Sequence, residues 1–472
     1  MSEKKQEYIP PSILNTLSYG SAGFWNQFIY MVFGTYVFYF YEVVVGLASL
    51  YVMFAMILFT IWDAINDPLI GHLTDRLTGF TKKWGKRFPW VIIGILPANF
   101  VFILLFMPPI VNAATDPLPI FGWIVLTTCL FDTLTTLCFV NVNALFPDKF
   151  QTDPARRKAR AISTPLGMLA MPIAFIIPPL VITFADQASY VTMAWICVII
   201  ALIVSLLFIP GMRENKALID RYYVSEKVKR EGFVSALKSS IKQQNFLVYV
   251  ILIFGFQVVT QSLTGSIAYA VNFVLQASPF FMTMLFASFL TGGIISVPFW
   301  IWVAKKLKNN KKAIQIGGVC LIIGTFLTTF YVDEITAAIY NFILGFTMGN
   351  FWALLSLIFA DCLDERIVLT KTDQRGATVG VESFFGRLAR GAQVAIFAII
   401  HVLTGFVEGA KTFTELAARS PSLELALLGI RFHMSVIPCI VLIICTFVFW
   451  KKYKLTPEAT VKIRAQMKEL GY

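Results

Sequence analysis

The stretch IWDAINDPLIGHLTD, residues 61–75, places acidic side chains inside one of the most apolar parts of the chain. Asp63, Asn66 and Asp67 are spaced so that a helix would bring all three to one face. A carboxylate at the middle of a bilayer costs roughly 2.5–3.5 kcal/mol on insertion scales. The pair therefore predicts a compensating partner, either an ion or another side chain.

Composition indicates the class of protein. Of the 472 residues, 57% are hydrophobic and 14% are charged, whereas about a quarter of the residues in a soluble domain are charged. The apolar runs are long enough to cross a bilayer, which takes about 20 residues, and they are apolar on all faces. We expect an all-α membrane protein with twelve transmembrane helices in two six-helix bundles. The predicted spans are 14–42, 48–76, 89–109, 118–147, 161–185, 189–210, 245–275, 280–304, 313–331, 335–362, 376–406 and 427–450.

Basic residues predict the orientation. Nearly all of the 39 Lys and Arg residues fall in alternate connections that include both termini, and the other connections contain only Lys411, Arg419 and Arg431. Cytoplasmic loops are enriched in Lys and Arg, so we expect both termini in the cytoplasm of a cell whose plasma membrane contains the protein. The net charge of +12 then indicates orientation and contact with anionic lipid, and no nucleic-acid partner is expected.

The longest polar stretch divides the spans six and six. We expect an N-terminal bundle over 1–210, a cytoplasmic linker over 211–244, a C-terminal bundle over 245–450 and a cytoplasmic tail over 451–472. The connection at 71–90 (GHLTDRLTGFTKKWGKRFPW) weakly resembles the one at 303–318 (VAKKLKNNKKAIQIGG). Two parallel six-span halves are typical of major facilitator transporters. The spacing of Gly345 and Gly349 predicts close helix packing.

The acidic pair predicts a cation site. Two carboxylates and an amide oxygen are hard ligands that suit Na⁺ or H⁺, and either ion would relieve the repulsion between the acids. Asp63, Asn66 and Asp67 are the predicted cation ligands, with Asp63 and Asp67 holding Na⁺ if sodium is the coupling ion. The alternative is that these carboxylates form structural ion pairs with Arg387 or Arg390. No other cofactor is expected.

Residues 62–90 (WDAINDPLIGHLTDRLTGFTKKWGKRFPW) resemble the signature of the glycoside–pentoside–hexuronide:cation symporters, a family of the major facilitator superfamily. The runs SYGSAGFWNQF (18–28) and TVGVESFFGRLARG (378–391) also fit that family, and the likeness covers essentially the whole chain. The resemblance implies cation-coupled sugar transport. The matching positions in the first run are Asp63, Asn66, Asp67, Pro68, Gly71, Asp75, Gly85, Lys86 and Pro89.

The chain departs from the family's pattern at several positions. Arg387 stands where the family usually has a functional Lys, and Gln27 and Phe139 stand where sugar-binding members have Asp. Gln27 is also similar to the residue in the lysophospholipid-transporting relatives. Amide and carboxylate side chains suit hydroxyl-rich ligands, although inside spans they are as often bonds between helices. The candidate substrate residues are Asn26, Gln27, Asp132, Asn141, Asn143, Gln257, Gln261, Asn272 and Arg387.

A gating role is predicted at the cytoplasmic ends of the spans. In major facilitator proteins an acid at the position of Asp75 meets the start of the eleventh span, which here is near Arg375 and Gly376. The candidate gating residues are Asp75, Arg76, Arg387 and Arg390. Lys82, Lys83, Lys86 and Arg87 are interpreted as basic anchors alone, and His72, His401 and His433 as isolated polar residues near span ends.

These observations favour a secondary transporter that couples a cation gradient (Na⁺ or H⁺) to symport of a sugar or glycoside-like solute by alternating access. We expect a monomer whose partners are this small solute, the cation and membrane lipid. One alternative is a cation-coupled transporter of a lysolipid-like amphipathic substrate. Another is a non-transporting membrane sensor or receptor. No nucleophile motif, phosphate loop or metal-ligand spacing is found, so enzyme activity is not expected.

Overall fold

The computed structural model describes residues 10–75, 79–224, 233–371 and 375–470, and every regular element within those ranges is helical. By its contacts the chain divides into two compact units. The N-terminal unit comprises Met1–Phe40 and Phe54–Lys229, and the C-terminal unit comprises Tyr41–Met53 and Arg230–Tyr472. Residues 41–53, which include the start of the second long helix at Ser49, pack with the C-terminal unit.

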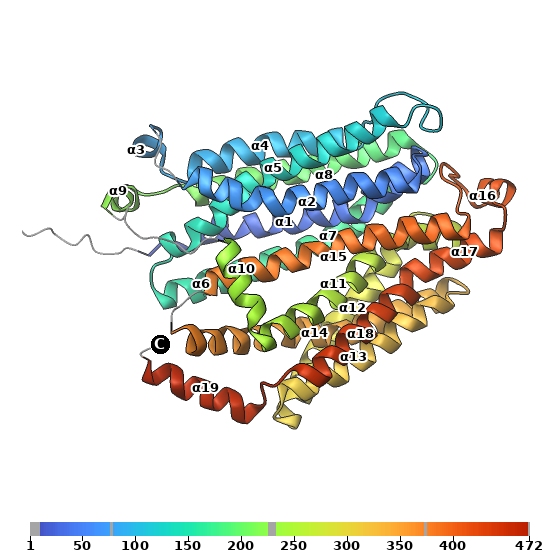
Figure 1. The fold of residues 1–472 in the computed structure, drawn as a ribbon. Helices are drawn as coiled ribbons and strands as arrows, with labels where there is room; N and C mark the ends of the chain where they lie inside the picture. Colours follow the sequence, from blue (N-terminus) through green and yellow to red (C-terminus); the bar gives the residue numbers. More distant parts are fainter. Residues whose placement is uncertain (1–9, 76–78, 225–232, 372–374, 471–472) are drawn as a thin grey trace, which may run out of the picture. The chain divides into compact units, whose positions relative to one another are not determined.

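The N-terminal unit is a bundle in which α1 packs against α6, α7 and α8, and α4 packs against α5 and α8. Figure 1 shows α1, α4, α5 and α8 running nearly parallel. Its helices are α1 (Ile13–Tyr39), α2 (Ser49–Thr74), α3 (Thr81–Trp84), α4 (Phe88–Leu104), α5 (Leu118–Lys149), α6 (Asp153–Met168), α7 (Ala170–Val181), α8 (Gln187–Phe208), the 3₁₀ turn η2 (Ile209–Met212) and α9 (Lys216–Val224).

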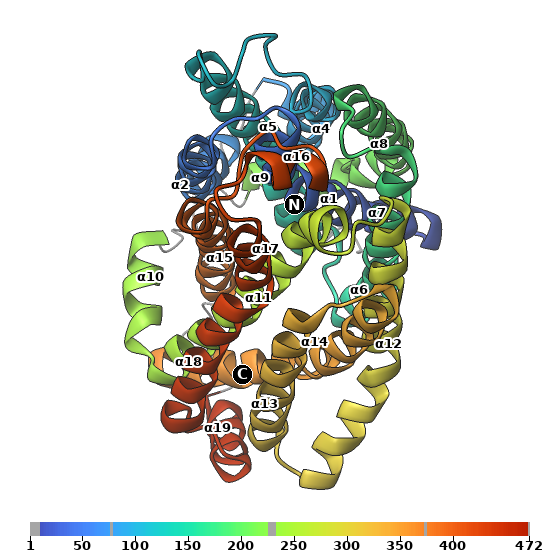
Figure 2. The ribbon, with the colours of Figure 1, turned by 90° about the vertical axis from the view of Figure 1, so that its right-hand side faces the viewer.

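In the C-terminal unit α11 packs against α15 and α18, while α14 packs against α12 and α13, as Figure 2 shows from the side. Its helices are η1 (Phe40–Val44), α10 (Phe233–Lys242), α11 (Gln244–Tyr269), η3 (Ala270–Val274), α12 (Phe280–Leu307), α13 (Asn310–Leu327), η4 (Thr328–Phe330), α14 (Glu334–Thr370), α15 (Arg375–Thr404), α16 (Phe413–Arg419), α17 (Leu423–Arg431), η5 (Phe432–Val436), α18 (Ile437–Lys452) and α19 (Pro457–Glu469).

Each predicted span overlaps helix in the described part of the chain, so the protein is an all-α membrane protein. Ten helical segments among the described residues are long and apolar enough to cross a membrane, and α4 is a shorter apolar helix. The span predicted at 161–185 is interrupted at Leu169. Pro172 explains the break, because proline lacks an N–H and its ring clashes with the carbonyl four residues earlier. The predicted linker contains two helices, α9 and α10.

Polar residues at the ends of the runs set where helices begin. Ser12, Thr152 and Asn309 each accept a hydrogen bond from the backbone N–H three residues on and so cap α1, α6 and α13. Asp333 and Thr336 form a reciprocal capping box at the start of α14. These caps satisfy N–H groups that have no partner inside the helix. Polar residues in the short connections therefore determine where these helices begin.

The two units share a local irregularity. In each, the first long helix passes into a π-helical turn, α1 into η1 and α11 into η3. A third π turn, η5, lies between α17 and α18. π turns are rare and occur frequently at functional sites. The matching order in α1–η1 and α11–η3 agrees with the weak sequence repeat between the halves.

Glycines allow α12 and α14 to pack with their backbones in close contact. A Cβ on Gly345 would lie 1.9 Å from the carbonyl oxygen of Phe289, and a Cβ on Gly292 would lie 2.2 Å from that of Phe342. A Cβ on Gly349 would meet the Ser296 hydroxyl at 1.8 Å. The predicted close packing at Gly345 and Gly349 is therefore confirmed.

We expect Gly345→Ala to destabilise the C-terminal unit by about 1–3 kcal/mol, because the methyl group meets a backbone carbonyl that cannot move away. Thermal unfolding in detergent would measure the loss. Gly380→Ala on α15 is the matched control, since a Cβ there meets nothing within 4 Å and alanine favours helix by up to about 1 kcal/mol. Equal melting temperatures for the two variants would contradict the packing argument.

Candidate functional site

The acidic stretch of α2 meets polar residues of α5 inside the N-terminal unit. Asn66 is fully buried and donates a 3.0 Å hydrogen bond to Asp132 Oδ2. Thr136 donates a 3.0 Å bond to Asp67 Oδ1. Asp63, one turn earlier on α2, is 5% exposed. Because Asp132 and Thr136 are also four residues apart, one face of α2 meets one face of α5.

This α2–α5 cluster, defined as Asp63, Asn66, Asp67, Asp132 and Thr136, contains only oxygen ligands of the hard type. The Oδ1 atom of Asn66 is buried and accepts no hydrogen bond, so it is oriented for a donor or a cation. Within the described residues, no group of three or more His, Cys, Asp and Glu side chains lies close enough to hold a metal ion. A cation in this cluster would therefore need amide and hydroxyl oxygens beside the carboxylates.

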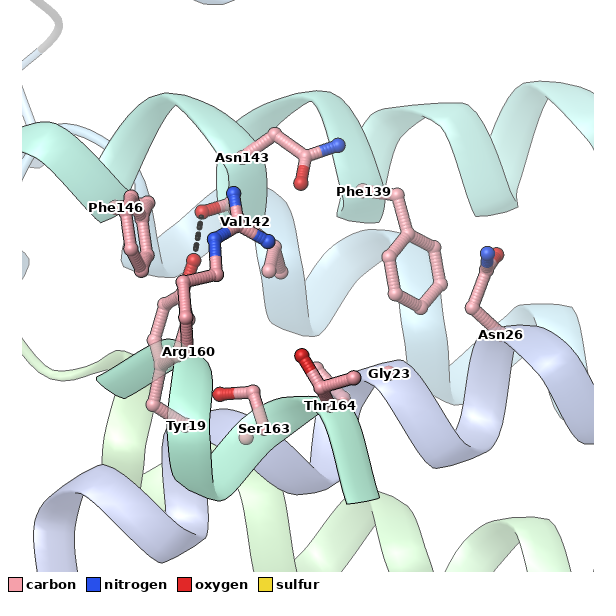
Figure 3. Close-up of a pocket in the computed structure, with 12 residues that line it drawn as sticks. Tyr19, Gly23, Asn26, Phe139, Val142, Asn143, Phe146, Arg160, Ser163 and Thr164 are labelled. Carbon is pink, nitrogen blue, oxygen red and sulfur yellow. Dashed lines mark hydrogen bonds between the residues drawn. The ribbon is translucent and has the colours of Figure 1, made fainter. Parts of the chain in front are cut away.

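A pocket lies in the same unit between α1, α5 and α6 (Figure 3), with a volume of about 210 Å³. Aromatic rings and polar groups face each other across it. Tyr19 spans one side and donates a 2.8 Å bond to the carbonyl of Val142. The Arg160 guanidinium stands 4.4 Å from the centre of the Phe146 ring. The lining residues are Tyr19, Gly20, Ala22, Gly23, Asn26, Phe139, Val142, Asn143, Phe146, Arg160, Ser163 and Thr164.

Helix α5 takes part in both features. Asp132 and Thr136 belong to the α2–α5 cluster, and Phe139 and Asn143, one and two turns further on, line the pocket. At 1.5 Å per residue, Thr136 and Asn143 are roughly 10 Å apart along the helix axis. Phe139 also stacks on the buried Trp25 of α1, with ring centres 5.5 Å apart. A ligand in the pocket and an ion in the cluster would therefore contact one rigid helix.

The predicted substrate residues do not form one set. Asn26 and Asn143 line the pocket, whereas Gln27 is exposed and Asp132 belongs to the α2–α5 cluster. Asn141 is buried, donates to the carbonyl of Leu137 and accepts from Arg87.

The remaining candidates lie in the C-terminal unit. Asn272 donates to the carbonyl of Lys411 and so fixes a connection. Gln261 is partly buried on α11, and Arg387 and Arg390 are partly buried on α15. Glu382, on the same helix as Arg390, accepts a 3.4 Å bond from Tyr249. Gln257 is partly buried on α11.

Asp75 has a partner close by in the chain. Arg87 Nη2 lies 2.5 Å from Asp75 Oδ1, and Lys86 Nζ lies 3.8 Å from the same oxygen. Arg87 is 2% exposed and also donates to Asn141 Oδ1 at 3.2 Å. The interpretation of Arg87 as a basic anchor alone is therefore wrong, because its guanidinium joins α2, α4 and α5. Arg76 lies outside the described residues, and the structure does not describe the side chain of Arg375 or the exposure of Gly376. A latch between Asp75 and the start of α15 therefore stays a prediction.

Glu214 completes this end of the unit. Its carboxylate accepts from the backbone N–H groups of Arg87 and Phe88 at 2.9 and 3.1 Å, where the positive end of the α4 dipole favours an anion. Gly85 has φ +92°, and a Cβ there would meet Glu214 Oε2 at 2.1 Å, which accounts for glycine at this position of the motif. Burial and the neighbouring Glu214 and Asp148 raise the pKa of Tyr222, so the phenol stays a neutral donor to Asp148.

Several contacts were missed from the sequence. Thr136 could have been predicted as a site residue, because it follows Asp132 by four residues on the same helix. Arg160 could not, because nothing in the basic run DPARRKAR distinguishes it from its neighbours. The prediction that the histidines are isolated is wrong for His401 and His433, whose ring centres lie 4.7 Å apart. No local signal could pair them, since they lie on different helices.

A bundle of membrane-spanning helices that holds a buried acid–amide cluster beside a pocket fits a membrane transporter. Residues 18–457 match the family model described as MFS/sugar transport protein, and the chain belongs to that family.

The relatives are transporters. The chain is 24% identical to a lactose permease of Lactobacillus delbrueckii subsp. bulgaricus, over 96% of this chain and 72% of that one. It is 24% identical to the mouse sodium-dependent lysophosphatidylcholine symporter 1, over 54% of this chain and 52% of that one. The match therefore spans about half the length of the mouse relative. Among solved structures, the nucleoside transporter NupG has a TM-score of 0.60 at 13% identity, covering 93% of this chain and 99% of the other. A D-xylose–proton symporter has a TM-score of 0.58 at 13% identity, covering 93% and 97%. These two show that the fold is that of major facilitator transporters.

We expect Arg87→Met to lower the stability of the N-terminal unit by about 1–3 kcal/mol, because it leaves the buried Asn141 oxygen without its donor. Thermal unfolding in detergent would report the change. Lys86→Met is the matched control, since its 3.8 Å contact with the partly exposed Asp75 contributes at most about 1 kcal/mol. A Lys86 variant as unstable as the Arg87 variant would refute this assignment.

Proposed function

We propose that this chain is a cation-coupled symporter of a hydroxyl-rich small solute, a sugar or glycoside. The observation that carries the proposal is the position of α5, which contributes Asp132 and Thr136 to the α2–α5 cluster and Phe139 and Asn143 to the pocket. The cation binds in the cluster and the solute in the pocket. The expected architecture is twelve spans in two six-helix bundles, with both termini in the cytoplasm and the chain in the plasma membrane.

Na⁺ is the coupling ion that best suits the cluster. The Asn66 amide oxygen and the Thr136 hydroxyl can coordinate a metal cation but cannot bind a proton at neutral pH. Asp132, which the sequence suggested for the substrate, is reassigned to the cation because it binds Asn66 directly.

Coupling requires that cation and solute together favour a conformational change that neither favours alone. Helix α5 supplies that link, because an ion held by Asp132 and Thr136 restrains the helix that presents Asn143 to the solute. Arg387 takes the place of the family's lysine and acts as a fixed positive charge, since arginine does not release its proton.

A lysolipid-like substrate is the second candidate. The mouse relative is a sodium-dependent lysophosphatidylcholine symporter. The pocket combines an arginine, which suits a phosphate group, with aromatic rings, which suit an apolar or cationic part of the same ligand. Proteoliposomes with imposed Na⁺ or pH gradients, screened with labelled sugars and with labelled lysolipids, distinguish the two candidates. Uptake of neither class under either gradient would overturn the proposal and favour a non-transporting sensor.

We expect Asp67→Asn to abolish gradient-driven uptake while the protein still reaches the membrane, because the cation loses a charged ligand. Uptake in proteoliposomes under a Na⁺ gradient measures this. Asp116→Asn, at an exposed acid in the connection before α5, is the matched control and keeps wild-type uptake. Normal coupled uptake by the Asp67 variant would exclude the α2–α5 cluster as the cation site.

We expect Asn143→Ala to raise the KM for the solute about tenfold, the effect of losing roughly 1.4 kcal/mol of hydrogen bonding, while the Na⁺ dependence stays unchanged. Gln27→Ala is the matched control, because Gln27 is an exposed amide on α1. Initial uptake rates over a range of solute and Na⁺ concentrations separate the two effects. If only the Gln27 variant raises KM, the substrate lies elsewhere.

A further inference from the structure

Lysines gather at one end of the C-terminal unit, where α12 ends, α13 begins and α18 ends. Lys305 and Lys306 lie in the last turn of α12, and Lys451 and Lys452 lie in the last turn of α18. Figure 1 shows α19 following α18 at this end. The basic patch is defined as seven exposed lysines, namely Lys305, Lys306, Lys308, Lys312, Lys451, Lys452 and Lys454.

A hydrogen bond joins two of the three helix ends directly. Lys311 Nζ donates to the carbonyl of Tyr453 at 2.5 Å, although the two residues are 142 positions apart in the chain. Helix α13 also packs against both α12 and α18, and Lys312 acts electrostatically on Glu458 of α19. The lysines of the two connections therefore form one patch in space.

The protein does not neutralise this patch. Among the described residues, none of the seven lysines forms an ion pair, whereas Asp75 pairs with Lys86 and Arg87 in the N-terminal unit. The helix dipole favours lysines in the last turns of α12 and α18, but it disfavours Lys312, which lies in the first turn of α13. So many like charges without acids beside them attract an anionic partner.

Aromatic side chains place the patch at the membrane surface. Trp302 lies one turn before Lys306 on α12, Trp450 directly precedes Lys451 on α18, and the two residues are 54% and 56% exposed. Lys306 Nζ lies 5.0 Å from the centre of the Trp302 ring, and Lys451 Nζ lies 5.8 Å from that of Phe447. Tryptophan is enriched at the boundary between hydrocarbon and water, so the lysines lie at the level of the lipid head groups.

An exposed apolar face of α13 leads from the patch into the bilayer. Ile316, Val319 and Ile323 are exposed, and their spacing places them on one side of the helix. Figure 2 shows α13 between α12 and α18, the two helices that carry the other lysines of the patch. This face suits an acyl chain whose head group lies among the lysines.

We propose that the basic patch and the exposed face of α13 form a binding site for an anionic phospholipid. The lysines bind the negatively charged head group, Trp302 and Trp450 contact the boundary between head group and chains, and an acyl chain lies along Ile316, Val319 and Ile323. A zwitterionic lipid binds less well, because its own cation cancels the charge of its phosphate. The site is separate from the α2–α5 cluster and the pocket, and it does not depend on which solute the protein carries.

Native mass spectrometry of the full-length protein tests the site. The protein is titrated with phosphatidylglycerol and, separately, with phosphatidylcholine that has the same acyl chains. The ratio of the two dissociation constants measures the preference for a negative head group. A photoreactive phosphatidylglycerol with its label in the head group then identifies the peptides that the bound lipid contacts.

Three variants separate the patch from the overall charge of the protein. The patch variant combines Lys305→Gln, Lys306→Gln, Lys312→Gln and Lys452→Gln. The charge-keeping variant places arginine at the same four positions. The matched control combines Lys82→Gln, Lys83→Gln, Lys158→Gln and Lys216→Gln, which are exposed lysines of the N-terminal unit.

We expect the wild type to prefer phosphatidylglycerol and to be labelled within 302–312 and 447–454. The patch variant loses about fivefold of this preference for each lysine that contacts the head group. The charge-keeping variant and the matched control keep the wild-type ratio. Thermal unfolding in detergent without added lipid reports whether each variant is folded.

Several results would overturn the proposal. They are a wild type without preference for phosphatidylglycerol, a folded patch variant with the wild-type ratio, and a matched control that loses as much as the patch variant. Labelling confined to peptides outside the patch would overturn it even if the patch variant failed to fold. Displacement of phosphatidylglycerol by an equal concentration of soluble glycerol phosphate would show a site for a soluble anion instead of a lipid.

Discussion

The hydrogen bond between Asn66 of α2 and Asp132 of α5 is the contact on which the arrangement of buried polar groups in the N-terminal unit depends. Both groups are fully buried, and polar side chains inside a membrane protein are too costly to face lipid. They must therefore face each other, a cavity or an ion. The bond orients the two helices so that Asp67 meets Thr136 one turn further along. The bond uses the amide nitrogen of Asn66 and leaves its single side-chain oxygen, Oδ1, without a hydrogen bond.

The same helix that accepts this bond carries the pocket. Asp132 and Asn143 lie on one α-helix, about three turns apart, so a displacement of one part of this segment would move the other. The α2–α5 cluster and the pocket are therefore joined by one helix rather than by a long chain of side chains. At one end of the unit, Arg87 links α2, α4 and α5, and Glu214 binds the start of α4. These contacts fix the positions of the three helices relative to one another.

The C-terminal unit uses buried charge differently. Its buried acid at Glu42 is surrounded by hydroxyl and imidazole donors that come from segments far apart in the chain; Glu42 and His401 are 359 residues apart. The α2–α5 cluster has an unsatisfied amide oxygen, whereas Glu42 has three donors. The first arrangement leaves an acceptor available to a donor or an ion, whereas in the second the protein itself supplies the donors.

Hydropathy alone determined that this is an all-α membrane protein, because a span must satisfy its own backbone hydrogen bonds and cover them with apolar side chains. The spacing of Asp63, Asn66 and Asp67 likewise determined that they share a face. The periodicity of the sequence does not indicate which other helix that face contacts. Only the tertiary structure paired Asn66 with Asp132, Asp75 with Arg87, and Glu42 with His401, since these contacts form between helices whose neighbours are chosen by packing. The isolated appearance of His401 and His433 in the sequence was misleading for the same reason.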